Sequence, residues 1–367
     1  MAGGLAAITA LGLTACASEE PDDPFPVYTQ PPGSSVPTPD PEDSAEPGRF
    51  SVSDLTTGLE VPWGIDFLPD GSALVTERDS TRVLQVAADG TSTVVGQVDD
   101  AEPRGEAGLL GVAVSPDFAT DSTVFLYVTT ADDNRVLRAT LRDKLTIEEA
   151  ILDSIPAHEN HDGGRIAFGP DGFLYVATGD ARDELSAQDP DSLSGKILRI
   201  TADGEAAPGN PTPGSPVWSL GHRNVQGLAW DDAGRLWASE FGSQTWDELN
   251  LIEPGNNYGW PEVEGTGGGD EFVDPQLVWS TDQASPSGLA FADGHLWMAA
   301  LRGNRLWRIK VTGAGKAVRP AAVIDGDYGR LRTVATTPEG DLWVTTSNRD
   351  GRGDPQDGDD RILLVEP

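Results

Sequence analysis

The sequence predicts an all-β protein, a six-bladed β-propeller over residues 49–367. Three observations lead to this fold class. The chain of 367 residues has 43 Gly and 28 Pro, as expected where short strands alternate with tight turns. A turn followed by a strand recurs six times, and a second kind of strand follows each copy. The copies are spaced by roughly 45–60 residues, which suits one four-stranded propeller blade.

The N-terminal residues predict export and a lipid anchor. Residues 3–15 form an apolar run that is too short to span a bilayer and is typical of a signal peptide. The run ends in Leu13 to Cys16 (LTAC), which resembles the processing box of bacterial lipoproteins. This implies a signal peptide over residues 1–16, lipidation of Cys16, and an extracytoplasmic protein that meets the cell membrane only through its lipid. A plain secretory signal is the alternative.

Residues 17–48 predict a disordered tether. They are rich in Pro, Ser and acidic side chains and contain few large apolar ones. Such a segment cannot bury enough surface to offset the entropy lost on ordering. Cys16 is the only cysteine, so no disulfide within the chain can form and the fold must depend on its core.

The charge of the chain argues against nucleic acid as a partner. Sixty acidic and 25 basic residues give a formal net charge of -35, so a polyanion would be repelled over most of the surface. Such acidity is typical of a soluble exported protein. Some of the carboxylates are also candidates for binding divalent cations.

From residue 50 onward, two strand types alternate. The copies of the first, which begins with a turn, are Pro69–Val75, Pro116–Val128, Pro170–Val176, Asp232–Trp237, Ala292–Trp297 and Pro338–Val344. The second has apolar residues at alternate positions, as one buried face requires. Its copies are Arg82–Val86, Arg135–Arg138, Lys196–Ile200, Glu248–Ile252, Arg305–Ile309 and Arg361–Val365. We expect the strand over residues 50–55 to pair with 361–365 and close the ring. A β-sandwich is the alternative, but it leaves the paired repeats unexplained.

Candidate functional residues are those where one copy departs from the others, because the repeated residues serve turns and packing. The Gly-rich loop 160–165 contains His161, a candidate general base because the pKa of histidine, about 6.5, suits proton abstraction. A surface histidine is the alternative. The loop 221–227 offers Arg223, Asn224 and Gln226, whose donors suit carboxylates or carbonyl oxygens. There the alternative is a solvated loop with one salt bridge.

Two further groups suggest bound ions. Acidic residues over 240–248, followed by the Asn- and Gly-containing turn 256–261, suit an oxygen-rich Ca²⁺ site, although the spacing is not that of an EF-hand. Arg330 and Arg332 should lie on the same side of a strand, because side chains alternate with period two. With Arg302 they form a cationic cluster in an acidic protein, which predicts an anionic ligand.

These residues together resemble the glucose/sorbosone dehydrogenase family, which includes soluble pyrroloquinoline quinone (PQQ)-dependent glucose dehydrogenase and bacterial aldose sugar dehydrogenases. The aldose-type members are the more similar. The resemblance implies oxidation of aldose sugars to lactones by hydride transfer to PQQ, with Ca²⁺ polarising the quinone. The motifs that carry it are residues 59–64, 108–111, the His161 loop, 195–199, 221–224, 256–261 and 330–332.

The resemblance also implies roles for individual residues. His161 takes the proton of the anomeric hydroxyl, and Asp180 orients it. The cofactor is bound by Arg223, Asn224, Gln226, Arg330 and Arg332. The carbonyls of Gly242 and Ser243 ligate the cofactor-bound Ca²⁺. Asp247, Glu248 and the Tyr258 carbonyl form a second, structural calcium site.

Three positions depart from the glucose enzyme. Arg302 stands in for a lysine that contacts the cofactor, Glu106 for a substrate-contacting glutamine, and Asn160 for an acid before the histidine. These changes keep the quinone site and put glucose specificity in doubt.

The electron acceptor is not predicted, and the protein is expected to be a monomer or homodimer. The alternatives are a Ca²⁺-dependent lactonase, since propellers also host that chemistry, and a non-catalytic module that binds a sugar or a partner.

Overall fold

A computed structural model describes Met1 and residues 50–367. The predicted lipidation site Cys16, the rest of the signal peptide and the tether lie outside the described residues. Among residues 50–367, no helix is long and apolar enough to cross a membrane.

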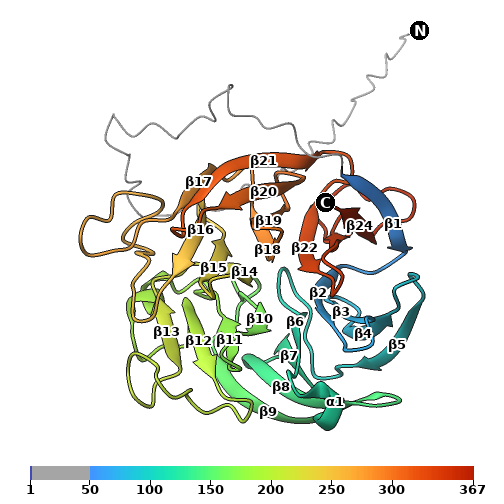
Figure 1. Cartoon of the computed structure of the whole chain (residues 1–367), viewed down its shortest axis with the longest axis horizontal. Coiled ribbons are helices and arrows are strands. Elements are labelled where there is room, and N and C mark those ends of the chain that lie inside the picture. The colour runs from blue at the N-terminus through green and yellow to red at the C-terminus, as the bar shows by residue number, and fades with distance from the viewer. Residues whose placement is uncertain (2–49) are drawn as a thin grey trace. The chain divides into compact units, whose positions relative to one another are not determined.

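The described chain folds into six antiparallel four-stranded sheets arranged around one axis, which confirms the six-bladed β-propeller (Figure 1). We number the blades in chain order. Blade 1 holds β2 (Pro62–Phe67), β3 (Ala73–Glu77), β4 (Arg82–Val86) and β5 (Ser92–Gln97). Blade 2 holds β6 (Leu109–Val114), β7 (Thr123–Thr129), β8 (Asn134–Leu141) and β9 (Leu145–Ile155). Blade 3 holds β10 (Ile166–Phe168), β11 (Leu174–Ala177), β12 (Lys196–Ile200) and β13 (Val217–Leu220).

The second half of the ring repeats this plan. Blade 4 holds β14 (Val225–Trp230), β15 (Leu236–Glu240), β16 (Trp246–Ile252) and β17 (Leu277–Ser280). Blade 5 holds β18 (Pro286–Ala292), β19 (His295–Ala300), β20 (Arg305–Val311) and β21 (Ala317–Asp325). Blade 6 holds β22 (Leu331–Thr336), β23 (Leu342–Thr346), β24 (Arg361–Glu366) and, from the other end of the chain, β1 (Ser51–Thr57). The predicted closure is confirmed, because β1 pairs with β24 from Ser51 opposite Glu366 to Thr57 opposite Arg361.

The two repeat units found in the sequence are the second and third strands of each blade. The first strands, β2, β6, β10, β14, β18 and β22, lie side by side around the axis (Figure 1).

Aromatic pairs join neighbouring blades. Examples are Phe67 with Trp343 and Tyr175 with Trp230, each with ring centroids 5.1 Å apart in an edge-on arrangement. Trp63, Trp237 and Trp297 are almost completely buried in the core.

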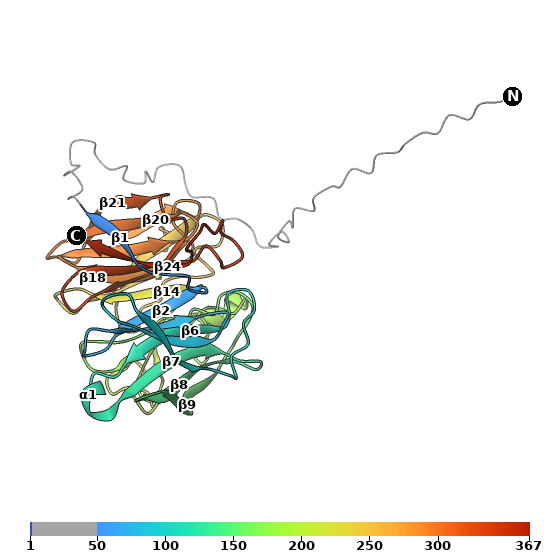
Figure 2. The same ribbon diagram turned by 90° about the vertical axis from the view of Figure 1, so that its right-hand side faces the viewer.

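Antiparallel pairing gives the propeller two different faces. Loops between blades and loops between the second and third strands of a blade lie on one face, which we call the upper face. Loops between the first and second strands lie on the lower face, together with the short helix α1 (Phe118–Asp121). Figure 1 looks onto the lower face, and Figure 2 turns that face, with α1, to the left. Within residues 50–367, the predicted site residues belong to the upper face or to strands that begin there, except Tyr258, which lies in the long loop between β16 and β17 and donates its amide to the Leu220 carbonyl in β13.

Candidate active site

A buried histidine–carboxylate pair stands at the upper end of blade 3. His161 Nδ1 lies 2.8 Å from Asp180 Oδ1, and Asp180 is completely buried. The indole N–H of Trp260 donates to the other oxygen of Asp180 at 2.8 Å. Because an ionised carboxylate can only accept hydrogen bonds, Nδ1 of the neutral imidazole carries the proton and Nε2 is left as the basic nitrogen.

The local backbone explains why His161 and Asp180 meet. Asp180 follows β11 and His161 precedes β10, and these strands are paired neighbours. At Gly179, a Cβ atom would lie only 1.8 Å from the His161 carbonyl oxygen, so the approach of the two loops requires glycine. The Asp180 amide also donates to the Arg223 carbonyl at 2.8 Å, which ties this pair to the next blade.

The pKa shifts of the pair suit a general base. Burial lowers the pKa of His161, and the nearby charge of Arg223 lowers it further, outweighing the opposite effect of Asp180 and Glu106. Burial raises the pKa of Asp180, but the hydrogen bond and charge of His161 outweigh it and the pKa falls below its usual value. At neutral pH, the pair therefore holds a neutral imidazole beside an ionised carboxylate.

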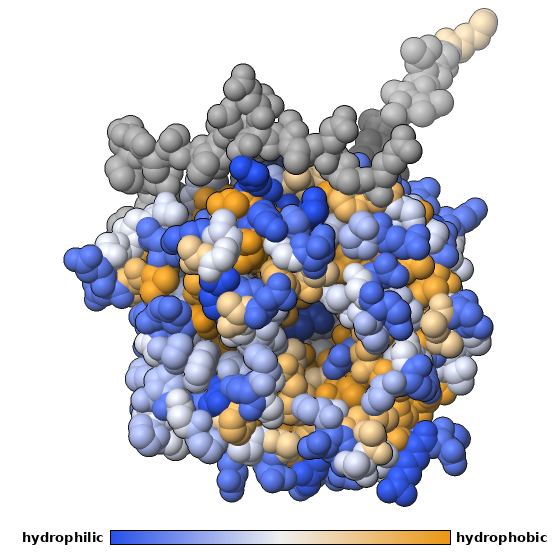
Figure 3. Space-filling model, viewed as in Figure 1, coloured by the Kyte–Doolittle hydropathy of each residue, from blue (hydrophilic) through white to orange (hydrophobic). Residues whose placement is uncertain are grey.

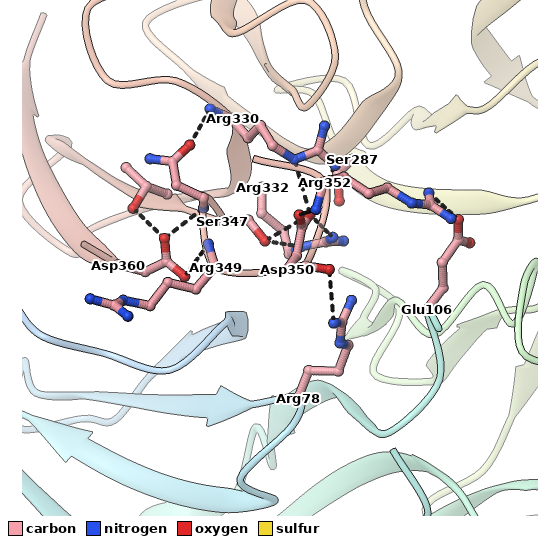
Figure 4. A network of polar contacts seen from close by, with 12 residues as sticks. Arg78, Glu106, Ser287, Arg330, Arg332, Ser347, Arg349, Asp350, Arg352 and Asp360 are labelled. Carbon is pink, nitrogen blue, oxygen red and sulfur yellow. Dashed lines mark hydrogen bonds and ion pairs between the residues drawn. The ribbon is translucent and has the colours of Figure 1, made fainter. Parts of the chain in front are cut away.

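Two predicted cofactor-binding arginines converge on one carboxylate, Asp350, which sequence analysis did not single out (Figure 4). Arg330, one residue before β22, donates from Nε and Nη2 to Asp350 Oδ2 at 3.0 and 2.8 Å. Arg332 lies 3.5 Å from the same oxygen and donates to Gln226 Oε1 at 3.2 Å. Burial lowers the pKa of Arg332 to about 10, against the opposing charge of Asp350. The cluster holds two cations and one anion, so it keeps a net positive charge.

Arg223 and Asn224 border the same region from the loop before β14. The Arg223 guanidinium lies over the Trp260 ring at 5.4 Å, and its buried Nε atom has no hydrogen-bond partner among the described residues. A buried donor without a partner costs free energy unless a ligand satisfies it. Asn224 accepts a hydrogen bond from the Gly163 amide at 3.0 Å, which links it to the His161 loop.

The two predicted substrate residues are bridged by Arg352, also missed from the sequence. Arg352 Nη1 lies 2.8 Å from Glu106 Oε1, and Nη2 lies 3.3 Å from Asn160 Oδ1. Glu106 also accepts from the His161 amide at 3.2 Å, so both predicted substrate residues lie next to the histidine. Burial raises the pKa of Glu106, but the charges of Arg352 and His161 outweigh it and the pKa falls below its usual value.

The loop between β15 and β16, with the predicted metal ligands Gly242 and Ser243, is held by a carboxylate. Glu264 Oε1 accepts hydrogen bonds from the amides of residues 243–246 at 2.7 to 3.1 Å. Asp247 accepts from the amides of Gly242 and Ser285 at 2.9 and 2.6 Å. These hydrogen bonds fix the backbone of the loop whose carbonyl oxygens are the predicted ligands.

Glu248 and Tyr258 line a small cavity together with Glu240 and Gly242. Glu248 lies opposite Glu240 in the pairing of β15 with β16. Burial and the charge of Glu240 raise the pKa of Glu248 well above its usual value, which fits a place where a cation would relieve two close carboxylates. Within residues 50–367, no group of three or more His, Cys, Asp or Glu side chains could hold a metal, so a Ca²⁺ site here needs carbonyl ligands as well.

Arg302 lies apart from these clusters. It is exposed in the turn between β19 and β20, on the upper face, where its charge adds to the Ser280 hydrogen bond in lowering the pKa of Asp282. Its predicted contact with the cofactor therefore stays a prediction.

Comparisons with known proteins show the family of the chain. The sequence profile of the family described as Glucose / Sorbosone dehydrogenase matches residues 59–363. The structure of the PQQ-bound form of aldose sugar dehydrogenase from Streptomyces coelicolor is 55% identical, with a TM-score of 0.84, and the match covers 88% of this chain and 99% of that chain. Aldose sugar dehydrogenase YliI of Escherichia coli is 32% identical over 84% of this chain and 92% of its own. Quinoprotein glucose dehydrogenase B of Acinetobacter calcoaceticus is 30% identical over 60% of this chain and 54% of its own.

Proposed function

Because the chain belongs to the glucose/sorbosone dehydrogenase family, we propose that it is a PQQ-dependent aldose sugar dehydrogenase that oxidises the anomeric carbon to a lactone. The observation that carries the proposal is the buried pair of His161 and Asp180, which lies beside Arg223 and Glu106. A neutral histidine oriented by a carboxylate is suited to removing a proton from a sugar hydroxyl.

The side chains of the upper face fit a cofactor that carries several carboxylates. The buried Nε of Arg223 lacks a partner, and the cluster of Arg330, Arg332 and Asp350 keeps a net positive charge. We infer that Arg330 and Arg332 hold carboxylates of PQQ, while Arg223, Asn224 and Gln226 bind its quinone side. When bound, PQQ supplies the hydride acceptor, and Ca²⁺ on the Gly242 and Ser243 carbonyls supplies a Lewis acid.

The chain's own residues accept and stabilise the proton in the proposed reaction. His161 Nε2 takes the proton of the anomeric hydroxyl as the C1 hydrogen leaves with its electron pair. Asp180 stabilises the imidazolium that forms, and Trp260 keeps the carboxylate in position. Glu106 and Asn160 lie on either side of Arg352, where they can contact the sugar hydroxyls.

The test is reconstitution with PQQ and Ca²⁺, followed by assay of a panel of aldoses with an artificial electron acceptor. We expect turnover by the parent, and loss of turnover with retained PQQ binding in His161→Ala. A parent that binds a sugar without oxidising it would favour a binding module. Hydrolysis of lactones without PQQ would favour a hydrolase.

We also propose that the protein is anchored outside the cytoplasm through a lipid on Cys16. Fractionation of cells that express the full chain tests this. The parent should sediment with membranes, whereas Cys16→Ala should not. Equal membrane association of the two proteins would contradict the anchor.

A further inference from the structure

The lower face of the propeller has a cavity that the proposed reaction does not use. It lies on the axis, is lined by residues of all six first strands, and has a volume of about 480 Å³. We call it the lower funnel. Figure 3 looks onto this face and shows a central hollow with hydrophobic and hydrophilic residues around it and a hydrophilic residue at the bottom. Pockets of roughly 300–1,000 Å³ are the usual size for small-molecule sites.

The wall of the lower funnel is aromatic near its opening. Phe67, Phe168, Trp230 and Phe291 stand at the lower ends of four first strands, and each is only partly buried. Arg165 also lines the funnel, three residues before Phe168 along the same stretch of chain. At about 3.3 Å per residue, Arg165 lies roughly 10 Å deeper in the funnel than these four aromatic residues.

Arg165 is a buried cation without a counter-ion. Its side chain is 7% exposed, and no carboxylate within residues 50–367 forms an ion pair with it. Nε donates to the Gln226 carbonyl at 2.8 Å and Nη2 to Thr333 Oγ1 at 2.9 Å, while its guanidinium lies over the Trp63 ring at 4.4 Å. Burial lowers the pKa of Arg165 to about 9, and the neighbouring cation Arg332 adds to this shift. An uncompensated buried charge is costly, and an anion in the funnel would relieve that cost.

One carboxylate, that of Asp66, lies in the wall of the lower funnel and limits where an anion could bind. Asp66 accepts hydrogen bonds from the amides of Val114 and Phe67 at 2.6 and 2.8 Å, so it is held against the β2–β6 junction. It stands next to Phe67, near the opening, whereas Arg165 is at the deep end. An anionic group would therefore be repelled near the opening and attracted at the bottom.

We propose that the lower funnel binds a small amphipathic carboxylic acid, with its carboxylate on Arg165 and its apolar body between the aromatic residues of the rim. The proposal does not depend on the dehydrogenase reaction, because the site opens on the opposite face. The expected ligand has an anionic head and an aromatic or aliphatic body about 10 Å long.

The test is calorimetric titration of the full chain with phenylbutanoate, using the neutral phenylbutanol and acetate as matched probes. Phenylbutanoate should bind at least about tenfold more tightly than either, because only it offers both the charge and the apolar body. The titration is repeated with PQQ and Ca²⁺ bound. Unchanged affinity is expected, whereas loss of binding would mean that the probe occupied the upper face, and would overturn the proposal.

Variants locate the probe. Arg165→Met should weaken phenylbutanoate binding about tenfold or more and leave phenylbutanol unaffected. Pro170→Glu adds a negative charge at the exposed rim without touching Arg165, and it should also weaken binding. Pro338→Glu is the matched control, since it changes an exposed proline in the equivalent turn of blade 6 that does not line the funnel. Asp66→Asn should tighten binding. Equal binding of acid and alcohol, or no effect of Pro170→Glu, would contradict the proposal.

Discussion

At the scale of single residues, the site depends on carboxylates that hold other side chains in place. Asp180 accepts from His161, Trp260 and the Arg182 amide, and Asp350 accepts from Arg330 and Arg332. The family motif predicted Asp180. Asp350 could not be predicted, because in an acidic chain nothing in its local sequence distinguishes it from its neighbours.

Asp180→Asn tests the orienting role. An amide can donate to Nδ1 and so favours the wrong tautomer of His161, which leaves Nε2 protonated. We expect kcat to fall by about 10²–10⁴-fold. PQQ affinity, measured by absorbance titration, should stay within about twofold, because Asp180 is a positioning residue and not a cofactor ligand. A variant that keeps its turnover would rule out this role.

The low pKa of His161 predicts the acid side of the pH profile. The base must be neutral to act, so activity is present above the pKa of His161 and is lost as the pH falls through it. Because burial and Arg223 place that pKa below the ordinary value of 6.5, the midpoint of the acid limb of kcat/KM should lie below pH 6.5. A profile whose acid limb lies above pH 6.5 would contradict the assignment of His161 as the base.

The buried carboxyl group of Asp66 should make the free energy of unfolding depend on pH. Burial raises its pKa from 3.8 to about 6, so the folded state binds the proton more tightly than the unfolded state. The protonated Asp66 side chain therefore contributes to the free energy of unfolding below pH 4, and this contribution is lost as the pH rises toward 6. Over this window, the parent should lose about 1–3 kcal/mol relative to Asp66→Asn. Denaturant unfolding of both proteins at pH 4 and pH 7 measures the difference.

At the scale of elements, the strands were more predictable than the loops. The second strands are buried along almost their whole length, most of the third strands bury alternate residues, and these repeated apolar residues can be recognised in the sequence. The outer strands vary from the four residues of β13 to the eleven of β9, so no common length marks them. Contacts between loops, such as Arg352 with Glu106, join residues 246 positions apart and leave no local pattern.

The loop at 242–246 depends on a residue outside it. Glu264→Ala removes the acceptor of four amides, and we expect a loss of about 2 kcal/mol in the free energy of unfolding. Exposed Glu262→Ala is the matched control and should change stability little. If both variants unfold at the same denaturant concentration, then Glu264 does not hold the loop.

At the scale of the whole molecule, the ring depends on β1, which comes from the start of the described chain and forms the outer strand of the last blade. A protein that begins at residue 49 should keep the melting temperature of the full chain, because residues 17–48 are predicted from their composition to be a tether outside the core. A protein that begins at residue 59 lacks β1, exposes the edge of β24 and should melt lower or aggregate. Differential scanning calorimetry of the two proteins makes the comparison, and equal melting temperatures would contradict a role for β1 in stability.

The pairing of β1 with β24 also has a consequence for biogenesis. Ser51 and Glu366 are 315 positions apart, so the first strand of the propeller to be synthesised cannot pair until almost the last residues of the chain have been made. The entropy of closing so long a loop makes this pairing a late event, after the other blades have formed. A chain that stops before its last seven residues would contain every residue of the proposed site and still lack β24, so that β1 and β23 would have no strand to pair with between them.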